Sequence, residues 1–572
     1  MEQLMAAFSW ANGILWSDWT PRILLAAGLL YTVWTIFSQY TSMTHGLAVV
    51  RGKYDNPDDP GAINHFQALS AALSATVGLG NIGGVALAIA AGGPGAVFYM
   101  WIVGLLGMAL KTVEITLAMM YRNTDDPENP HGGAMWVVEK VLGEKGSEWK
   151  GLARAIGVFF CITLLISTMT GGNMFQAWSV AGLSEGYFGI PKVATGIIMA
   201  LIVGAVIIGG IKRIGSVAGK LVPFMCLMYV TAAIIVLIVN IDEVPAMFLS
   251  IFQSAFNGEE AQRAFLGGSV GWAFIWGMKR ALFSNEAGQG SAPIAHAAAK
   301  TDEPAREGIV GGIGPFIDTL CICTITALVI LVTQAWNREA IGDIEGVVVV
   351  AQSAENPEVW QVRASTDFDA LPESTQWGDD SNFYMVANVE GATHARGNSL
   401  VRLQGSVVVN DVDSGVRTLV WKDVKFDDKW DQVPSAVVPR DLGVYQAYDG
   451  AQLTAHAFDR QFPGLGRWLV TIAAWLFAIS TMISWSYYGE QGMVYMLGMR
   501  SVLPYKLAFL ACTIWAAAGI NSTEHMEVFM DLGTGAMLWA NLPIIFVFGH
   551  LAVRCLNDYG NRFKAGEFKR HD

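Results

Sequence analysis

Charged residues and cysteines are scarce in this chain of 572 residues. Asp, Glu, Lys and Arg make up 15% of it, against 53% hydrophobic residues, and the mean hydropathy is +0.40. This balance is typical of a protein that crosses a membrane several times. The six cysteines fall in or beside apolar stretches and none has zinc-type spacing, so the sequence indicates neither a disulfide framework nor a structural zinc site.

Several functional signatures are also missing. The chain carries no catalytic triad, metal-binding cluster or nucleotide-binding loop, so we predict that it is not an enzyme. Its net charge of -13 stems largely from one soluble-looking insert and predicts no nucleic-acid partner. The N-terminus lacks the basic lead and cleavage site of a signal peptide, and residues 1–22 instead resemble a short interfacial helix that carries tryptophans.

What the sequence has in abundance is apolar stretches of membrane-spanning length. Eleven of them are long enough to cross a hydrocarbon core of ~30 Å as helices, near residues 23–42, 66–91, 95–121, 155–183, 193–211, 219–240, 268–299, 308–335, 465–498, 503–520 and 527–556. The lysines and arginines of the short loops and the tail gather on one side of these spans. The positive-inside rule therefore places the N-terminus outside and the C-terminus in the cytoplasm, and we expect a bacterial inner membrane.

Two of these spans are interrupted. The first break lies in Ser74–Gly95 (SATVGLGNIGGVALAIAAGGPG) and the second in Phe283–Pro293 (FSNEAGQGSAP). Backbone groups freed at bilayer depth are tolerated only where protein buries them or where they line a watery cavity. Interrupted spans in corresponding positions of two halves are the strongest sequence indication of a transporter binding site.

The order of the spans predicts how the chain is divided. Without the first span ten remain, which form two sets of five with opposite orientation, each beginning with a broken helix. We therefore predict an all-α polytopic membrane protein with a five-plus-five inverted repeat and one extra N-terminal span. The predicted parts are 1–65 (N-terminal segment and extra span), 66–240 (first repeat), 268–336 and 465–556 (second repeat), 337–464 (insert) and 557–572 (cytoplasmic tail).

The insert at 337–464 differs from the rest in composition. Alternating runs such as NFYMVANVEG and SLVRLQGSVVV predict strands, and Val412–Gly415 between two runs predicts a hairpin turn. The span topology puts this small β-domain outside the cell, between the eighth and ninth spans. Its role and any protein partner stay open.

The first break offers groups that could bind a zwitterion and a cation. Amides around Thr76–Gly80 are freed from the helix and can receive a carboxylate near the positive end of the outer half-helix. The carbonyl groups of Ser74, Thr76 and Val77 can turn toward a cation, and Asn81 offers a neutral oxygen. Close packing of small residues between membrane helices is the structural alternative.

Other polar residues in apolar spans are candidates with alternatives of their own. Glu286 is costly at membrane depth and therefore a functional candidate, or it caps the inner half-helix. Asn173 and Gln176 lie one helical turn apart and could orient a zwitterion or form interhelical hydrogen bonds. Asp318 in the eighth span could balance the charge of a cation.

Several motifs are similar to those of one transporter family. GLGNIGGVA, RALFSNEAGQGSAPIAHAAAKT, FAISTMISWSYYGE and MDLGTGAMLWANLP resemble the alanine/glycine:cation symporter family of the amino acid-polyamine-organocation superfamily. The resemblance covers both halves of the membrane part and implies the leucine-transporter fold. That family usually has Thr where Leu79 stands, and a β-domain is not one of its usual features.

The resemblance also implies residue roles. It places Phe283 beside the substrate and Ser284 beside a cation, and it matches Ser480 and Thr481 to a hydroxyl pair at a sodium site. The implied substrate-binding residues are Thr76, Gly78, Leu79, Gly80, Asn173, Gln176, Phe283 and Trp485. The implied sodium ligands are Ser74, Thr76, Val77, Asn81, Ser284, Phe477, Ser480 and Thr481. The candidates for gating or coupling are Arg280, Glu286, Asp318 and Asp531, and by analogy Arg280 and Asp531 form an outer ion pair.

Together these features predict secondary active transport. The expected function is sodium-coupled import of a small neutral amino acid, alanine or glycine by resemblance, with Na⁺ as coupling ion and no organic cofactor. The expected partners are the amino acid and the lipid bilayer. Two alternatives stay open: a proton-coupled transporter of another small amino acid, with Glu286 taking the proton, and an amino-acid-sensing receptor that uses the β-domain.

Overall fold

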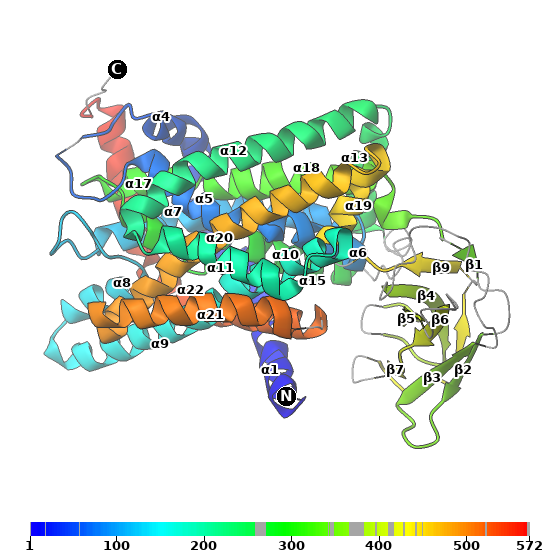
Figure 1. Cartoon of the computed structure of the whole chain (residues 1–572). Helices are drawn as coiled ribbons and strands as arrows, with labels where there is room; N and C mark the ends of the chain where they lie inside the picture. The colour runs from blue at the N-terminus through cyan, green and yellow to red at the C-terminus, as the bar shows by residue number, and fades with distance from the viewer. Residues whose placement is uncertain are drawn as a thin grey trace.

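A computed structural model shows a helical bundle with a small β-domain at one end (Figure 1). It describes the whole chain except residues 1, 18, 57, 258–269, 341, 344–347, 365–381, 395–396, 410–416, 427–429, 441–442, 449, 521–522 and 569–572. The C-terminus lies at the end of the bundle away from the β-domain, and α1 (Glu2–Leu15) projects from the side of the bundle. These two ends are called the β-domain end and the C-terminal end.

Helices make up the bundle. Up to the loop before the second broken span they are α2 (Trp19–Trp34), α3 (Ser38–Thr41), α4 (Leu47–Val50), α5 (His65–Thr76), α6 (Val85–Gly92), α7 (Gly95–Met120), α8 (Ala134–Gly143), α9 (Lys150–Met169), α10 (Phe175–Phe188), α11 (Lys192–Ile207), α12 (Gly210–Val239) and α13 (Val244–Phe256). After it come α15 (Val270–Asn285), α16 (Ala292–His296), α17 (Pro304–Gly311), α18 (Thr324–Val332), α19 (Ala451–Gln461), α20 (Gly466–Leu497), α21 (Val502–Gly519) and α22 (Thr523–Lys564). Four π-helical segments lie between successive helices: Ser42–Gly46, Gly80–Gly84, Thr170–Met174 and Phe316–Cys323.

Seven helical segments within the described residues are long and apolar enough to cross a membrane, or up to nine if each of two bent pairs is one span. One pair bends by 69° between α2 and the helical stretch 38–50, and the other bends by 50° between α5 and the stretch 80–92. The expected spans 193–211 and 268–299 appear as shorter helices, α11 and the interrupted α15 and α16. The chain is therefore a multi-pass helical membrane protein, whereas eleven spans and the inverted repeat stay predictions.

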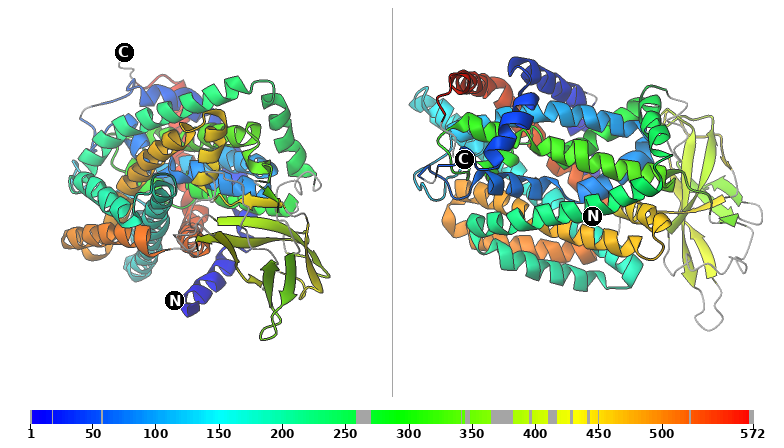
Figure 2. Two further views of the ribbon diagram at one scale, coloured as in Figure 1. Left: turned by 45° about the vertical axis from the view of Figure 1, so that its right-hand side comes forward. Right: turned by 90° about the horizontal axis from the view of Figure 1, so that it is seen from above.

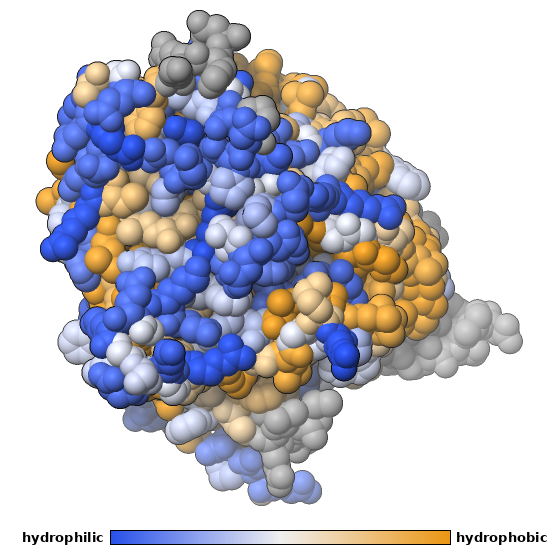
Figure 3. Space-filling view, turned by 90° about the vertical axis from the view of Figure 1, so that its left-hand side faces the viewer, coloured by the Kyte–Doolittle hydropathy of each residue, from blue (hydrophilic) through white to orange (hydrophobic). Residues whose placement is uncertain are grey.

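Burial separates central helices from peripheral ones. Every residue of α20 from Phe477 to Gly492 is buried, although this stretch includes several hydroxyl groups. By contrast, Leu201 on α11, Leu227 on α12 and Leu507 on α21 are 61–69% exposed, and Figures 1 and 2 show these helices at the margin of the bundle. The C-terminal end presents mostly hydrophilic residues, with hydrophobic ones toward its edges (Figure 3). This distribution fits a bundle with lipid around its sides and water at its ends.

The β-domain contains two sheets. The larger one has the strand order β1-β9-β4-β5-β6, with β8 paired to β4, and the smaller one has the order β2-β3-β7. The strands are β1 (Gly342–Asp343), β2 (Val348–Gln352), β3 (Val359–Ala364), β4 (Asn382–Glu390), β5 (Leu400–Val409), β6 (Arg417–Trp421), β7 (Val424–Lys425), β8 (Ala436–Pro439) and β9 (Gly443–Gln446). The two quoted runs form β4 and β5, as predicted. The predicted turn at Val412–Gly415 lies outside the described residues, although β5 and β6 on either side pair antiparallel.

The expected β-rich insert ends in a helix that packs on the bundle. From α19, the Thr454 hydroxyl donates a hydrogen bond of 2.9 Å to the Ile82 carbonyl in the first broken span. At the base of the β-domain, the guanidinium of Arg338 lies 5.0 Å from the ring centre of Tyr448, and that ring stacks on His456 of α19. Burial, with Arg338 nearby, lowers the pKa of His456 to about 4. The ring is therefore neutral near pH 7, and α19 connects the β-domain to the first break.

The close approach of α7 and α15 yields a testable prediction. A Cβ atom at Gly277 would lie against the carbonyl oxygen of Ala96 and 2.9 Å from the Cβ of Tyr99. Gly277→Ala should therefore lower the stability of the protein by about 1–3 kcal/mol, because backbone has to move. Gly182→Ala is the matched control on α10, since a Cβ there meets nothing within 4 Å, and it should stabilise its helix by up to about 1 kcal/mol. Thermal unfolding in detergent measures both, and an unchanged midpoint for Gly277→Ala would contradict the packing.

Candidate functional site

The first broken span opens between α5 and the π-helical turn Gly80–Gly84. The freed amide of Gly78 donates to Asn81 Oδ1 at 2.8 Å, and that of Leu79 lies 3.4 Å from Gln176 Oε1. A side chain at Gly78 would overlap the hydroxyl of Thr481. The close approach of Thr481 therefore favours glycine there, and polar side chains take up the backbone groups that the helix releases.

The second broken span is irregular between Asn285 and Ala292. Glu286 has a φ of 56°, a left-handed conformation that is uncommon outside glycine. Its Oε2 accepts a hydrogen bond of 2.5 Å from Ser291, the residue that precedes α16. Glu286 therefore lies beside the start of the inner half-helix, but its bond is to the Ser291 side chain and no side chain caps α16, so the capping alternative stays a prediction. Asn541 of α22 donates to the Gly288 carbonyl at 2.9 Å and so satisfies part of this loop from outside.

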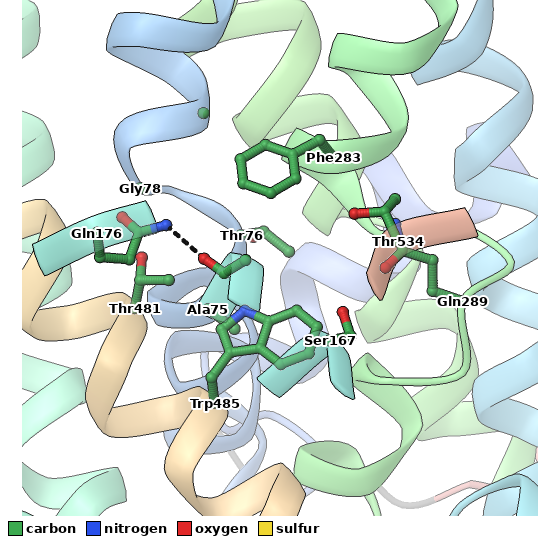
Figure 4. Close-up of a pocket in the computed structure, with 12 residues that line it drawn as sticks. Ala75, Thr76, Gly78, Ser167, Gln176, Phe283, Gln289, Thr481, Trp485 and Thr534 are labelled. Carbon is green, nitrogen blue, oxygen red and sulfur yellow. Dashed lines mark hydrogen bonds between the residues drawn. The ribbon is translucent and has the colours of Figure 1, made fainter. Parts of the chain in front are cut away.

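The two breaks meet at a small pocket (Figure 4). The rings of Phe283 and Trp485 lie on opposite sides of it. Both rings press on glycines of the α9–α10 connection, since a Cβ at Gly171 would lie 3.0 Å from Phe283 and one at Gly172 would overlap Trp485. The pocket is lined by Ala75, Thr76, Gly78, Gly80, Ser167, Gly171, Gln176, Phe283, Gln289, Thr481, Trp485 and Thr534. It is therefore a narrow slot suited to a small solute.

The sequence analysis predicted some of the residues that line this pocket and missed others. The expected site residues that line the pocket are Thr76, Gly78, Gly80, Gln176, Phe283, Thr481 and Trp485. The residues that it missed are Ala75, Ser167, Gly171, Gln289 and Thr534. Those five are small residues or isolated polar residues within apolar or glycine-rich stretches. Only the glycines on either side of Gln289 and of Thr534, in the triplets GQG and GTG, mark these positions as irregular in the sequence.

Asn173 and Leu79 do not line the pocket, contrary to expectation. Asn173 Nδ2 donates to the Phe509 carbonyl at 2.7 Å, and its Oδ1 accepts from the Thr513 hydroxyl at 2.8 Å. Its amide therefore joins α21 to the bundle, which is the interhelical alternative. Leu79 is fully buried and contributes its backbone amide near Gln176. Asn173 lies within the π-helical segment Thr170–Met174, whereas Gln176 lies in the regular helix α10, and the two amides have different neighbours.

A cluster of oxygen atoms lies between the end of α5 and the middle of α20. Ser74 donates to the Ser480 carbonyl at 2.7 Å, and the Ser480 hydroxyl donates to the Phe477 carbonyl at 2.8 Å. Thr481 Oγ1 is buried and has no hydrogen-bond partner among the described residues. Buried polar atoms are nearly always paired, so this hydroxyl marks a place that a ligand could complete. Val77, whose carbonyl group was also expected to bind the cation, is the C-terminal cap residue of α5 beside this cluster.

A second cluster surrounds the fully buried carboxylate of Asp318. It accepts hydrogen bonds from Asn81 at 2.6 Å, from Ser284 at 2.9 and 3.0 Å and from Thr319 at 2.7 Å. Asn81 and Ser284 come from the two breaks, so one carboxylate joins both. The sequence did not predict this arrangement, and the expectation that Asp318 balances the charge of a cation stays a prediction.

The pocket is closed toward the β-domain end by ion pairs whose partners differ from the expected pair. Arg280 does not pair with Asp531 but with Glu527, at 3.2 Å. Asp531 pairs with Lys279, at 3.0 Å. Neighbouring positions on α15 point in different directions, and the analogy could not distinguish them. Trp16, which follows α1, donates to the Asp531 carbonyl at 2.9 Å and lies under the Lys279 ammonium, so the N-terminal segment packs against this closure.

Toward the C-terminal end, a buried carboxylate joins both inner half-helices. Glu307 of α17 accepts from His65 of α5 and from His296 of α16 at 2.5 Å. Beside it, Ile63 and Ala299 form a parallel β-bridge. Opening this end requires at least some of these contacts to separate.

A helical membrane bundle with a closed pocket where two broken helices meet defines a membrane transporter for a small solute. The chain belongs to the sodium:alanine symporter family, whose sequence model matches residues 1–361 and 435–572. The unmatched stretch lies in the middle of the β-domain.

Individual relatives agree with this assignment. The chain is 33% identical to the sodium/alanine symporter AgcS of Methanococcus maripaludis over 531 residues, which are 93% of this chain and 92% of AgcS. It is 38% identical to the amino-acid carrier protein AlsT of Bacillus subtilis over 309 residues, covering 54% and 63% of the two chains. The protein of Bacillus subtilis named "Probable sodium/glutamine symporter GlnT" is 35% identical over 335 residues, covering 58% and 67%. The names of these relatives therefore include more than one amino acid.

The closure at the β-domain end predicts coupling between Lys279 and Asp531. In a chain with a cysteine introduced at Ala75 in the pocket, Lys279→Gln and Asp531→Asn should each increase the rate of thiol labelling. The labelling rate of the double variant should then increase by less than the product of the two single increases, because both substitutions remove the same interaction, which is worth about 0.5–3 kcal/mol. Lys564→Gln at the far end of α22 is the control, and the chain without the introduced cysteine gives the background. Strictly multiplicative effects would show that the two residues do not act as a pair.

Proposed function

We propose that this protein is a sodium-coupled symporter that imports small neutral amino acids by alternating access. The observation that carries the proposal is the closed pocket at the two breaks, with the unpaired Thr481 hydroxyl directly beside the freed amide of Gly78. One wall offers hydrogen-bond donors for an anionic group, and the neighbouring oxygen cluster suits a hard cation. The positive-inside pattern supports an orientation with the N-terminus and β-domain outside and the C-terminus in the cytoplasm.

The substrate carboxylate would bind at the first break. The Gly78 amide now bonds to a side-chain oxygen of Asn81, and a carboxylate oxygen offers the same kind of acceptor with a full charge, which makes a stronger hydrogen bond. Phe283 and Trp485 would enclose the carbon skeleton of the substrate. Because these rings pack directly on Gly171 and Gly172, the space between them is small. This geometry supports a small amino acid of the kind named for AgcS.

Sodium would bind in the oxygen cluster between α5 and α20. Ser74, Ser480 and Thr481 bring hydroxyl groups there, and the carbonyl groups of Val77 and Phe477 complete a neutral, oxygen-only set suited to a hard monovalent ion. Asn81, Ser284 and Asp318 offer a second place for a cation, since the side-chain hydrogen bonds to the buried Asp318 carboxylate come from neutral donors, although the buried ammonium group of Lys111 also acts on this carboxylate. Thr76 lies between the two places, at the last turn of α5.

Uptake of a zwitterion against a gradient requires coupling to a driving ion, and we propose sodium in that role. A zwitterion carries no net charge and gains nothing from the membrane potential. One accompanying cation supplies ~2.3 kcal/mol per 100 mV, enough for roughly a 50-fold concentration ratio. Binding both solutes before closure would prevent the ion from leaking alone.

The two closures would alternate during transport. Opening toward the β-domain end separates Lys279 from Asp531 and Arg280 from Glu527. Opening toward the C-terminal end separates the His65 and His296 side chains from Glu307. Each closure consists of a few polar contacts, so binding energies of a few kcal/mol are enough to shift the equilibrium between them. Glu286, bonded to Ser291, is assigned the role of holding the inner half-helix, which disfavours it as a proton carrier.

The sodium site predicts the behaviour of two Thr481 variants. Thr481→Ala should raise the sodium concentration for half-maximal alanine uptake about tenfold or more, because loss of one polar partner in a buried site costs about 1–3 kcal/mol. Thr481→Ser keeps the oxygen and should stay close to the wild type. Uptake of labelled alanine into proteoliposomes under an imposed sodium gradient measures both.

Two results of this experiment would be decisive. An Ala variant with normal folding and normal sodium dependence would remove Thr481 from the cation site. A wild-type protein that takes up no amino acid under any sodium gradient would overturn the proposed function.

A further inference from the structure

One end of the pocket carries three polar side chains that the carboxylate and sodium sites do not use. Ser167 comes from α9, Gln289 from the second break and Thr534 from α22, and Figure 4 shows them together at the end away from Gln176. They are only 1–3% exposed. The polar end, as these three residues are called here, is therefore built from three elements that are far apart in the chain.

The polar end has unused hydrogen-bonding capacity. The hydroxyl groups of Ser167 and Thr534 form no hydrogen bond with another described residue, although both line the pocket. Gln289 Nε2 donates to the Leu282 carbonyl at 2.7 Å, and its Oε1 stays available. These positions are fixed, because a Cβ at Gly533 would lie 2.7 Å from the Cα of Ser167, so α9 and α22 touch directly beside Thr534.

Geometry separates this end from the ionic groups of a bound amino acid. The carboxylate and the ammonium group share one carbon atom, so a carboxylate at Gly78 keeps the ammonium group near the breaks. There α5 and α15 both end, and the carbonyl groups at the C-terminus of a helix lack helical partners and attract positive charge. The ammonium group is satisfied at that end of the pocket, and the polar end is left for the side chain.

We propose that Ser167, Gln289 and Thr534 recognise the substrate side chain, and that the preferred substrate bears a small hydroxyl-bearing side chain, as serine does. A methyl group would leave three buried polar groups without partners, and sites built for a hydroxyl group discriminate strongly against analogues that lack it. The walls formed by Phe283 and Trp485 restrict the side chain to a small size. This inference rests on the proposed function, because it requires an amino acid in the pocket.

The test compares serine with alanine in a variant that removes one hydroxyl group without changing its shape. Labelled L-alanine is taken up into proteoliposomes under a sodium gradient, and unlabelled L-serine or L-alanine competes. In the wild type, serine should compete at lower concentration than alanine. Thr534→Val should raise the half-inhibitory serine concentration about tenfold or more, whereas that of alanine should change by less than about threefold.

Two further variants complete the design. Ser167→Ala should act in the same direction as Thr534→Val. Thr168→Val is the matched control, because Thr168 is also a fully buried threonine with an unpaired hydroxyl group but does not line the pocket. For Thr168→Val, the ratio of the half-inhibitory concentrations of serine and alanine should equal that of the wild type. Thermal unfolding in detergent confirms that each variant is folded.

The outcomes separate the inference from the proposed function. Equal losses for serine and alanine in Thr534→Val would show that the polar end binds a group common to all amino acids and would overturn side-chain recognition. A wild type in which alanine competes better than serine would also overturn it, while leaving sodium-driven transport intact. Absence of any amino-acid uptake by the wild type would instead contradict the proposed function itself.

Discussion

Backbone amide and carbonyl groups that leave a helix inside a membrane need partners within the protein, and the rest of this structure depends on that constraint. Both broken spans free such groups beside one pocket. Asn81, Gln176 and Asn541 supply side-chain partners for some of them, each through a terminal amide. An amide side chain both donates and accepts, so residues of two types can satisfy either kind of freed backbone group.

The contacts that the proposed alternating access would separate are polar. A gate has to open to water repeatedly, and apolar surface would be exposed at a cost each time. Ion pairs such as that of Lys279 with Asp531 exchange protein partners for water at little net cost. Glu307 with its two histidines is more deeply buried, so its separation costs more. The two closures therefore differ in kind, and the inner half-helices are the more firmly held part of this structure.

Much of this arrangement follows from the sequence, and the remainder has physical reasons to escape it. The breaks were predictable because glycines and polar residues interrupt long apolar runs, a local signal. The strands β4 and β5 were predictable from alternation. Asn173 and Gln176 were paired by helical spacing, but Asn173 lies in a π-helical segment and Gln176 in the regular helix that follows. The pairing of Asp531 with Lys279 instead of Arg280 depends on the rotation of α15. Ser167 was missed because one hydroxyl in an apolar helix carries no information about a partner hundreds of residues away, and the glycines around Thr534 mark an irregular position without indicating its partners.

The β-domain shows how a domain can be added without disturbing the site. The family match stops at residue 361 and resumes at 435, so β8, β9 and α19 belong to the shared part, whereas β4 to β7 fall in the unmatched stretch. The contact that reaches the pocket region, from Thr454 to the Ile82 carbonyl, lies in that shared part. Of the unmatched strands, β4 pairs with β8 and β9, β5 and β6 continue that sheet, and β7 pairs with β3. The unmatched stretch also contacts the bundle directly, because the His394 ring lies edge-on to that of Trp272 on α15, with ring centres 5.9 Å apart. The residues that line the pocket all lie in the shared part of the chain, and the unmatched stretch reaches the bundle both through β8 and β9 and at the first turn of α15.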